Sequence, residues 1–576
     1  MHERRAINTP LRRARVTVRL LDFARKVTWR SRPMTIAGKS LGARVDSAWE
    51  RLTAALDRHH AWPLAALAVL YFAVTAIRAR ATPFWHDEIY TLLLSRVPTV
   101  ADVWRAARSG ADAMPPLNLF LTRAAESLAG RSPIASRLPA MLGFCTMSVT
   151  VFYLVRARST MLLAFAAMLM PWYTRAYRYS YEARGYGVML GLFALLLWSW
   201  SEAALGRRRR FWLPVFAIVF AASLWNHYFA ALTFVPVAAG EAYRWARRGA
   251  PDWPLWGAAA IGLAFCAPLV PLVRQASGQG ATFWRHVTSS DVGDTYWWLF
   301  HDLWSFGPWA LASLAGAVFL GLARGRGKLS VSIVPNHELV AGVVALGLPI
   351  LAVGAGRVTG GYTPRYALSG VLPWVLAAPL ALWWLSGRSR LVELVLVVML
   401  LIGVVRPSAD LLEHPLQMVD PVAARPLLLA QLRSAPPVVV AGAVQFLQLW
   451  YYAPRDLQSR LWYVDDPARS VRHLGSDTAD RGYLLLARWA PVGIKTYDQL
   501  ERQRSFTLYD DRTGWLSAQL QETGAVVEET AIEEGAHIAH VTMPDRSLSW
   551  RRGSDIVDLP SDGRSHNENR HVTLPR

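Results

Sequence analysis

The chain has 576 residues, of which 53% are hydrophobic and only 18% are charged, and its net charge is +21. The apolar residues form runs of roughly 15–20 up to about residue 406, a length that matches a hydrocarbon core roughly 30 Å thick. This distribution excludes a soluble globular protein over that part of the chain and predicts a polytopic membrane protein. The two cysteines, Cys145 and Cys266, both lie in apolar runs and offer neither a zinc motif nor a disulfide framework.

Residues 1–60 form a strongly basic segment directly before the first apolar run. A nucleic-acid-binding arm is one interpretation of this charge. A cytoplasmic leader beside an anionic leaflet is the simpler one, because a membrane span follows at once. We therefore expect membrane lipids, and no nucleic acid, among the partners.

The apolar runs predict a polytopic α-helical membrane protein with about 11–13 spans, in a membrane module at 61–410. The candidate spans are 61–80, 137–156, 160–174, 186–204, 211–225, 227–245, 253–273, 305–323, 338–356, 366–385 and 391–406. A twelfth segment, 116–130, is ambiguous because it carries Asn118, Thr122, Arg123 and Glu126.

Connectors rich in Arg and Lys predict the orientation, because such connectors face the cytoplasm. They lie at 207–210, 244–248, 324–328 and 388–390. The outer connectors are then 81–115, 175–185, 226–227, 274–304 and 357–365, followed by everything after 406. The number of crossings agrees with this orientation if the other eleven segments cross the membrane and 116–130 does not cross it fully. We expect a plasma (inner) membrane protein with a cytoplasmic N-terminus and an extracytoplasmic C-terminal domain.

An acidic pair, Asp87 and Glu88, follows the first span. An aspartate facing lipid costs roughly 2.5 kcal/mol or more at the bilayer centre. The pair therefore lies in the wet interface or lines a cavity where it has a task. A solvated loop carboxylate is the ordinary interpretation, but the aromatic neighbours Phe84, Trp85 and Tyr90 favour a reaction centre at Asp87. Partial burial beside Phe84 and Trp85 would raise the pKa of Asp87 toward a useful range.

Further polar and aromatic side chains collect at the same leaflet, which suggests a cavity opening outward. The candidates for substrate binding are Tyr90, Arg184, Tyr186, His227, Arg365 and Tyr366. For the two arginines the structural alternative is snorkelling at the start of a span. For His227 it is a hydrogen bond that stabilises a tight turn.

The chain after residue 410 reads as a small soluble α/β domain, 411–545, followed by a disordered tail at 546–576. Strands are predicted at 437–442, 461–464, 483–487 and 505–509, and helices at 443–452 and 515–523. The domain contains no Gly-rich phosphate loop.

The order of motifs resembles a known group. Asp87-Glu88-x-Tyr90 is followed by Pro115-Pro116-Leu117, Arg137-Leu138-Pro139, Tyr181-Glu182-Ala183-Arg184-Gly185-Tyr186, His227-Tyr228 and Arg365-Tyr366. This succession is similar to that of the family-39-type glycosyltransferases of the GT-C fold, which include protein O-mannosyltransferases and the bacterial aminoarabinose transferase of lipid A. The resemblance covers roughly residues 60–410.

The resemblance implies inverting transfer of a sugar from a polyprenyl-phosphate donor on the outer face. It assigns Asp87 as the acceptor-activating base, with Glu88 and Tyr90 flanking it. It implies no metal and no cofactor. The chain departs from the pattern before Pro115, where relatives often carry a charged or polar residue and this chain has Ala113 and Met114.

Three classes of function remain open at this point. One is the membrane glycosyltransferase, whose acceptor can be a protein, a glycan or a lipid. A second is a transporter or flippase of lipid-linked glycans. A third is a scaffold without catalysis that presents the soluble domain, and the residues around Asp87 argue against it. Transporters show paired, broken segments in two related halves with polar groups near the midplane, whereas this chain has no evident repeat and its polar residues cluster at one leaflet.

Overall fold

The computed structural model describes residues 41–278, 280–306, 311–316, 318–319, 334–434 and 436–544. The tail predicted at 546–576 and part of the span predicted at 305–323 lie outside the described residues. The chain divides into two compact units, Met1–Pro63 and Leu64–Arg576. The described part of the first unit contains helix α2 (Leu41–His59), and all the elements discussed below lie wholly or mainly in the second.

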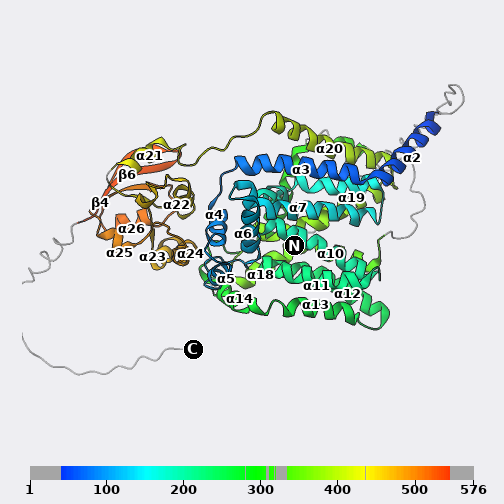
Figure 1. Ribbon diagram of the computed structural model, residues 1–576, viewed down its shortest axis with the longest axis horizontal. Helices are drawn as coiled ribbons and strands as arrows, with labels where there is room; N and C mark the ends of the chain where they lie inside the picture. Colours follow the sequence, from blue (N-terminus) through cyan, green and yellow to red (C-terminus); the bar gives the residue numbers. More distant parts are fainter. Residues whose placement is uncertain are drawn as a thin grey trace, which may run out of the picture. The chain divides into compact units, whose positions relative to one another are not determined.

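Long apolar helices form the membrane module of the second unit (Figure 1). Within the described residues, six are long and apolar enough to cross a membrane. They are α3 (Ala61–Ala81), α7 (Pro133–Arg156), α10 (Tyr186–Ala204), the segment Trp253–Ser277 with α13 (Trp253–Ala264) and α14 (Val270–Ser277), the segment Pro364–Leu385 with η7 (Pro364–Gly370) and α19 (Val371–Leu385), and α20 (Arg390–Glu413). A seventh is the pair α17 (Asn336–Leu346) and α18 (Leu348–Thr359), bent by 52° at Gly347.

The other spans predicted within the described residues are also helical, although shorter or less apolar. They are α8 (Met161–Leu169) with η1 (Met170–Tyr173), α11 (Arg209–Asn226), and η3 (Tyr228–Thr233) with α12 (Phe234–Arg248). The ambiguous segment becomes α6 (Leu117–Ala129), whose 13 residues rise only about 20 Å. A hydrocarbon core is roughly 30 Å thick, so α6 is too short to cross it as one straight helix.

Helices α7 and α10 touch backbone to backbone, because glycines stand where they meet. A Cβ at Gly187 would lie 2.5 Å from the carbonyl oxygen of Ala140, and one at Gly191 would lie 2.5 Å from that of Gly143. Contacts this short are not tolerated by any side chain. The pair therefore packs closely, and it carries Arg137 and Arg184 at or near the same end.

Short helices fill the connectors between the long ones. They are α4 (His86–Ser95), α5 (Val100–Arg108), α9 (Arg175–Arg178), η2 (Tyr179–Tyr181), η4 (Ala267–Leu269), η5 (Gly280–Thr282), α15 (Asp291–Phe300) and η6 (His301–Phe306). The first of these, α4, carries the acidic pair in its first turn, where the helix dipole favours negative charge.

A buried ion pair ties α4 to the membrane helices. The guanidinium of Arg137, fully buried in α7, donates to both carboxylate oxygens of Glu88 at 2.7 and 2.8 Å. The backbone amide of Ala183 donates to Glu88 as well, at 2.7 Å. Arg137 also donates to the carbonyls of Ala79 and Thr82 at the end of α3. One buried pair thus joins α3, α4, α7 and the segment before α10.

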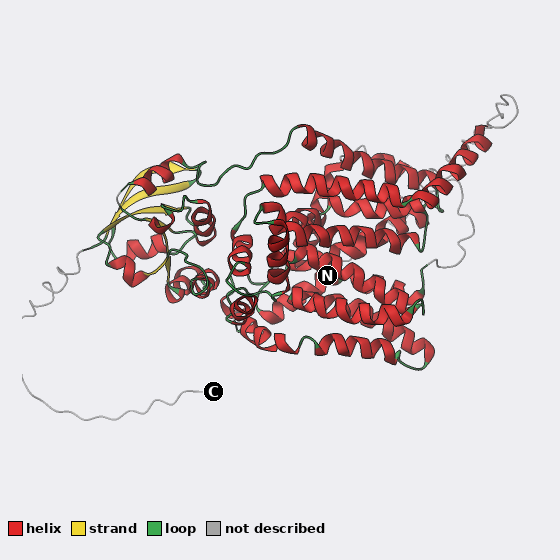
Figure 2. Ribbon diagram, viewed as in Figure 1, coloured by secondary structure: helices red, strands yellow, loops and turns green. Residues whose placement is uncertain are grey.

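The C-terminal part forms a mixed sheet, with helices packed around the strands (Figure 2). Its strands are β1 (Val438–Val440), β2 (Leu461–Asp465), β3 (Ile494–Thr496), β4 (Ser505–Asp510), β5 (Val526–Glu533) and β6 (Ala536–Thr542), in the order β3-β2-β1-β4-β6-β5. The first four pair in parallel and the last two are antiparallel. The helices are α21 (Pro426–Arg433), α22 (Ala443–Tyr452), η8 (Gln458–Arg460), α23 (Pro467–Leu474), α24 (Thr478–Leu486), α25 (Tyr497–Glu501) and α26 (Leu516–Glu522). We refer to residues 426–542 as the sheet domain.

Most elements predicted for the sheet domain are confirmed, and the helix at 443–452 matches α22 exactly at both ends. The strand predicted at 483–487 is wrong, because Tyr483 to Leu486 form the last turn of α24. In that helix Tyr483 and Leu486 face the core while Leu484 is 41% exposed. A short apolar run carries no period that separates a strand from a helix.

The sheet domain and α4 share one hydrophobic cluster. It joins Ile89 and Leu92 of α4 to Phe446 and Trp450 of α22 and to Tyr483 of α24, all of them buried. Helix α4 is therefore held between Arg137 on one side and the sheet domain on the other.

Replacement of Arg137 by Met should destabilise the protein by about 3–5 kcal/mol, because it leaves the Glu88 carboxylate buried without its cation. Thermal unfolding of the purified protein in detergent measures this loss. Arg105→Met breaks the pair with Asp102, in which Arg105 is 65% exposed, and serves as the control with an effect below about 1 kcal/mol. Equal shifts for the two variants would contradict the structural role of the buried pair.

Candidate active site

Asp87 lies in the first turn of α4, where its carboxylate meets a cation from a distant part of the chain. Its Oδ2 lies 3.0 Å from a terminal nitrogen of Arg365, and its Oδ1 lies 3.1 Å from Nδ1 of His86. The side chain remains 18% exposed. The helix begins after Pro83 and Phe84, and the amide of Trp85 donates to Glu88 at 3.3 Å, which fixes the first turn.

The pKa of Asp87 lies well below its usual range. Burial by itself would raise that pKa, but the nearby charge of Arg365, the hydrogen bond with His86 and the charge of Arg184 together outweigh burial. The expected net rise in the pKa of Asp87 is therefore wrong, because these partners outweigh burial. Asp87 is an ionised, paired carboxylate.

Arg365 enters from η7 (Pro364–Gly370), the short helix that opens the last segment but one. Its guanidinium lies over the ring of Trp85, 5.3 Å from the ring centroid, a distance within the range of a cation–π contact. Its Nε is buried and has no hydrogen-bond partner among the residues that the structure describes. One donor of this guanidinium is thus free for a further acceptor.

Arg184 lies between α4 and the loop before α6. It pairs with Asp112, at 3.0 and 3.4 Å to the two carboxylate oxygens, and donates to the hydroxyl of Thr91 at 3.1 Å and to the carbonyl of Asp87 at 3.3 Å. Asp112 stands two residues before Met114, in the loop where the chain departs from the family pattern. It is the acidic partner that this loop supplies.

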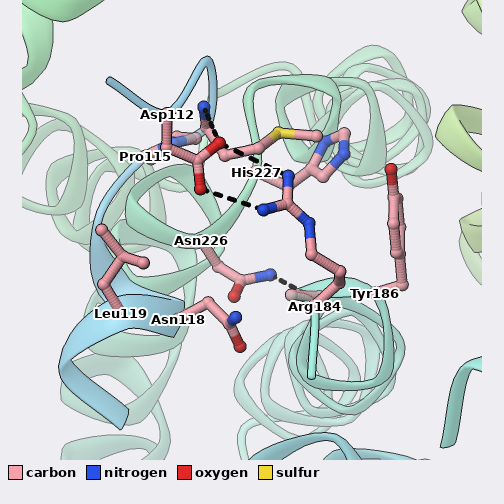
Figure 3. A pocket seen from close by; sticks show the side chains of 10 residues that line it. Asp112, Pro115, Asn118, Leu119, Arg184, Tyr186, Asn226 and His227 are labelled. Carbon is pink, nitrogen blue, oxygen red and sulfur yellow. Dashed lines mark hydrogen bonds and ion pairs between the residues drawn. The ribbon is translucent and has the colours of Figure 1, made fainter. Parts of the chain in front are cut away.

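A pocket opens beside the pair of Arg184 and Asp112 (Figure 3). It is lined by Asp112, Met114, Pro115, Asn118, Leu119, Arg184, Gly185, Tyr186, Asn226 and His227. Asn226 donates to the carbonyl of Gly185 at 2.7 Å, while Nδ1 of His227 accepts from the amide of Phe229 at 3.1 Å. Both side chains are held by these bonds, and each keeps one buried polar atom without a partner.

Unsatisfied polar atoms concentrate around this pocket and the pair of Asp87 and Arg365. In the described part of the chain, 18 buried side-chain nitrogen or oxygen atoms have no hydrogen-bond partner. Eight of them belong to Trp85, His86, Glu182, Tyr186, Asn226, His227, Thr363 and Arg365. Buried polar groups are otherwise almost always hydrogen-bonded, so this concentration indicates a place for a polar ligand.

Glu182 is a second carboxyl group in this region, and its side chain is 8% exposed. Within the described part of the chain, its Oε1 is buried without a hydrogen-bond partner. Burial, followed by the negative charge of Glu88, raises the pKa of Glu182 to about 8. Two carboxyl groups at one site thus have opposite protonation at neutral pH, with Asp87 ionised and Glu182 neutral.

The structure places most of the predicted site residues at or beside the pocket, but Tyr90 and Glu88 make their contacts elsewhere. Arg184, Tyr186 and His227 line the pocket, and the ring of Tyr366 lies 5.6 Å from that of His227. Tyr90 instead packs against Tyr483 of the sheet domain. Glu88, predicted as catalytic, has both oxygens engaged by Arg137, Ala183 and Trp85.

Sequence reasoning missed Asp112, Asn226 and Glu182 as parts of the site. Asp112 sits in a polar loop with no motif of its own, and Asn226 lies in the connector predicted at 226–227, where only His227 was taken as a candidate. The sequence signal for Glu182 was its position two residues before Arg184, just ahead of a predicted span. Among the described residues, no group of three or more His, Cys, Asp or Glu side chains is arranged to hold a metal ion.

Comparison with known proteins supports the fold. No family model matches the chain, and no curated protein matches it significantly. Among solved structures, ArnT from Cupriavidus metallidurans in the apo state aligns with 86% of this chain and 98% of that chain, at 12% identity and a TM-score of 0.50. ArnT from the same organism bound to undecaprenyl phosphate aligns with 83% and 97%, at 12% identity and a TM-score of 0.46. The Archaeoglobus fulgidus oligosaccharyltransferase aligns with 79% and 68%, at 10% identity and a TM-score of 0.32.

The likeness to apo ArnT covers nearly all of that chain, and this chain has long apolar helices and a C-terminal sheet. Together with the long apolar helices, the likeness shows that this chain is a multi-pass membrane protein with the GT-C fold.

Proposed function

We propose that the protein transfers a sugar from a polyprenyl-phosphate-linked donor to an acceptor on the outer face of the membrane, with inversion at the anomeric carbon. The observation that carries this proposal is the Asp87–Arg365 pair, surrounded by unsatisfied buried polar atoms on the loops between membrane helices. The GT-C fold and the order of motifs support it. The acceptor can be a protein, a glycan or a lipid.

The two arginines suit the donor phosphate. A guanidinium binds phosphate through two parallel hydrogen bonds, and Arg365 has a buried Nε that is free to donate. Arg184 faces the adjoining pocket but is engaged by Asp112. We therefore assign the first phosphate contact to Arg365, while Arg184, His227 and Asn226 line the space beside it.

Phosphate binding at Arg365 also activates the base. The charge of Arg365 lowers the pKa of Asp87 in the ligand-free protein. A phosphate that takes over this guanidinium weakens its pairing with Asp87, so the basicity of the carboxylate rises when the donor is in place. Arg365 therefore keeps the basicity of Asp87 low while the two side chains are paired, and this basicity rises once the donor phosphate pairs with Arg365.

The transfer step then needs both carboxyl groups. The acceptor hydroxyl attacks the anomeric carbon and gives its proton to Asp87, while the bond from that carbon to the phosphate oxygen breaks and its electrons move to the phosphate. Negative charge grows on the leaving phosphate, where arginine stabilises it. Glu182, neutral below its pKa of about 8, donates a hydrogen bond there, which an ionised carboxylate cannot do. Glu88 is assigned a structural role, because its oxygens are already engaged.

Asp87→Asn should fold normally and lose transfer by about 10²–10⁴-fold, the usual contribution of a general base. The assay is transfer of radiolabelled sugar from polyprenyl-phosphate donors by purified protein in liposomes. The control is Asp294→Asn, an exposed carboxylate on α15. Normal turnover in Asp87→Asn would remove Asp87 from the mechanism, and lipid-linked sugar crossing the bilayer without any transfer would favour a flippase.

The pH profile should report Glu182. Its pKa of about 8 means that the donating, protonated form is present below pH 8 and is lost as the pH rises through that value. Transfer, measured as kcat/KM, should therefore fall on the alkaline side. In Glu182→Gln the amide donates at every pH, so the alkaline fall should disappear. A wild-type rate that instead rises through pH 8 would make Glu182 a base rather than a donor.

A further inference from the structure

The sheet domain contacts the loop that carries Asp87 directly, and it contacts the loop that carries Arg365 through the intervening segment around Thr282. On the first loop, the amide of Phe84 donates to the hydroxyl of Tyr452 at 2.7 Å, and Gln448 donates to the carbonyl of Phe84 at 2.9 Å. Both side chains come from α22. They fix the two polar groups of one residue, three positions before Asp87.

Further contacts support this first anchor. His86 lies against Tyr483 of α24, with ring centroids 5.9 Å apart, and bonds Asp87 through Nδ1. Phe84 is buried in the same hydrophobic cluster as the core of the sheet domain. The Asp87 carboxylate thus bonds His86, and both His86 and the nearby Phe84 are in contact with the sheet domain.

The second anchor lies on a different segment. The hydroxyls of Ser476 and Thr478 donate to the carbonyl of Thr282, at 2.8 and 3.2 Å. Thr282 ends η5, and Gly280 in the same turn lies against Gly360, where a Cβ would come within 2.6 Å of the carbonyl oxygen of Gly280.

The segment after Thr282 continues along the loop that leads to Arg365. The amide of Tyr362 donates to the carbonyl of Arg285 at 3.3 Å, and the ring of Phe283 lies where a Cβ on Gly361 would be only 2.6 Å away. Tyr362 stands three residues before Arg365. The second anchor therefore supports the cation as the first supports the carboxylate.

We propose that the sheet domain is a brace that sets the spacing between the carboxylate loop and the arginine loop, with Gln448, Tyr452, Ser476 and Thr478 as positioning residues. The inference rests on the proposed function for its kinetic consequence. The sheet domain then acts on the rate of transfer through the geometry of the pair, without touching either substrate.

The test is a double-mutant cycle on the full-length protein in liposomes. Variant A carries Gln448→Met and Tyr452→Phe, variant B carries Ser476→Ala and Thr478→Val, and a third protein carries all four changes. Each of A and B should lower kcat by about 10-fold or more, because small misplacements of reacting groups are costly, while the KM for the donor stays within about twofold. The matched control is Tyr497→Phe, which removes a hydroxyl from the separate cluster on the sheet's other face.

The combined variant decides whether the two anchors act as one body. A single brace is lost when either end is released, so the four changes together should lower kcat no further than A or B alone. Independent local supports would multiply, giving about 100-fold, and that result would overturn the brace. Unchanged kcat in both A and B would overturn it as well.

Hydrogen exchange of backbone amides gives a readout that needs no activity. A and B should each raise exchange in residues 84–95 and in 357–366, with no further rise in the combined protein and no change in α7. Exchange that changes only beside the substituted anchor contradicts the brace. If the wild type transfers no sugar from any polyprenyl-phosphate donor, the proposed function fails, and the exchange cycle alone still decides the brace.

Discussion

The buried pair of Arg137 and Glu88 is the constraint on which the site depends. Removing two charges from water is expensive, and the expense is recovered only where the geometry is good and every remaining donor and acceptor is satisfied. Here the arginine is fully buried and bonds Glu88 and the carbonyls at the end of α3, while Glu88 also takes the amide of Ala183. The arrangement holds α4 in one position, and Asp87 comes with it.

The adjacent residues Asp87 and Glu88 therefore have contrasting environments. Glu88 faces inward and meets a complete set of donors, whereas Asp87 faces a region where many polar atoms lack partners. A carboxylate whose oxygens are all hydrogen-bonded stabilises the fold and has little remaining capacity to bond a substrate. An incompletely satisfied region costs stability, and proteins keep such regions mainly where a ligand completes them. The contrast separates scaffold from site within two consecutive residues.

Much of the membrane module was predictable from sequence, because runs of apolar residues translate directly into helices of known rise. The site was predictable in part. Asp87, Arg184 and Arg365 stood out as charges at the ends of spans, but their partners could not be inferred. The pairing of Asp87 with Arg365 joins residues 278 positions apart, and the lowered pKa of Asp87 follows from that pairing rather than from burial.

Local ambiguity accounts for the remaining differences. Residues Tyr483 to Leu486 are apolar in a run too short to carry a period, so the helix was mistaken for a strand. Strands β5 and β6 were not anticipated, because the buried face of β6 depends on its neighbour β4 and β5 in turn pairs with β6. Asp112 and Glu182 gained their meaning only from Arg184 and Glu88, which the fold places beside them.

The glycine contact between α7 and α10 has a bearing on how this site can vary. With no side chain between the two backbones at Gly143, Gly187 and Gly191, their separation is already at its lower limit. Arg137 and Arg184 project from or just before these helices, three residues from Ala140 and Gly187 respectively. A methyl group added at one of these glycines would push α7 and α10 apart and would thereby displace both Arg137 and Arg184. Changes of substrate are therefore more accessible through the pocket's loops than through this part of the helical frame.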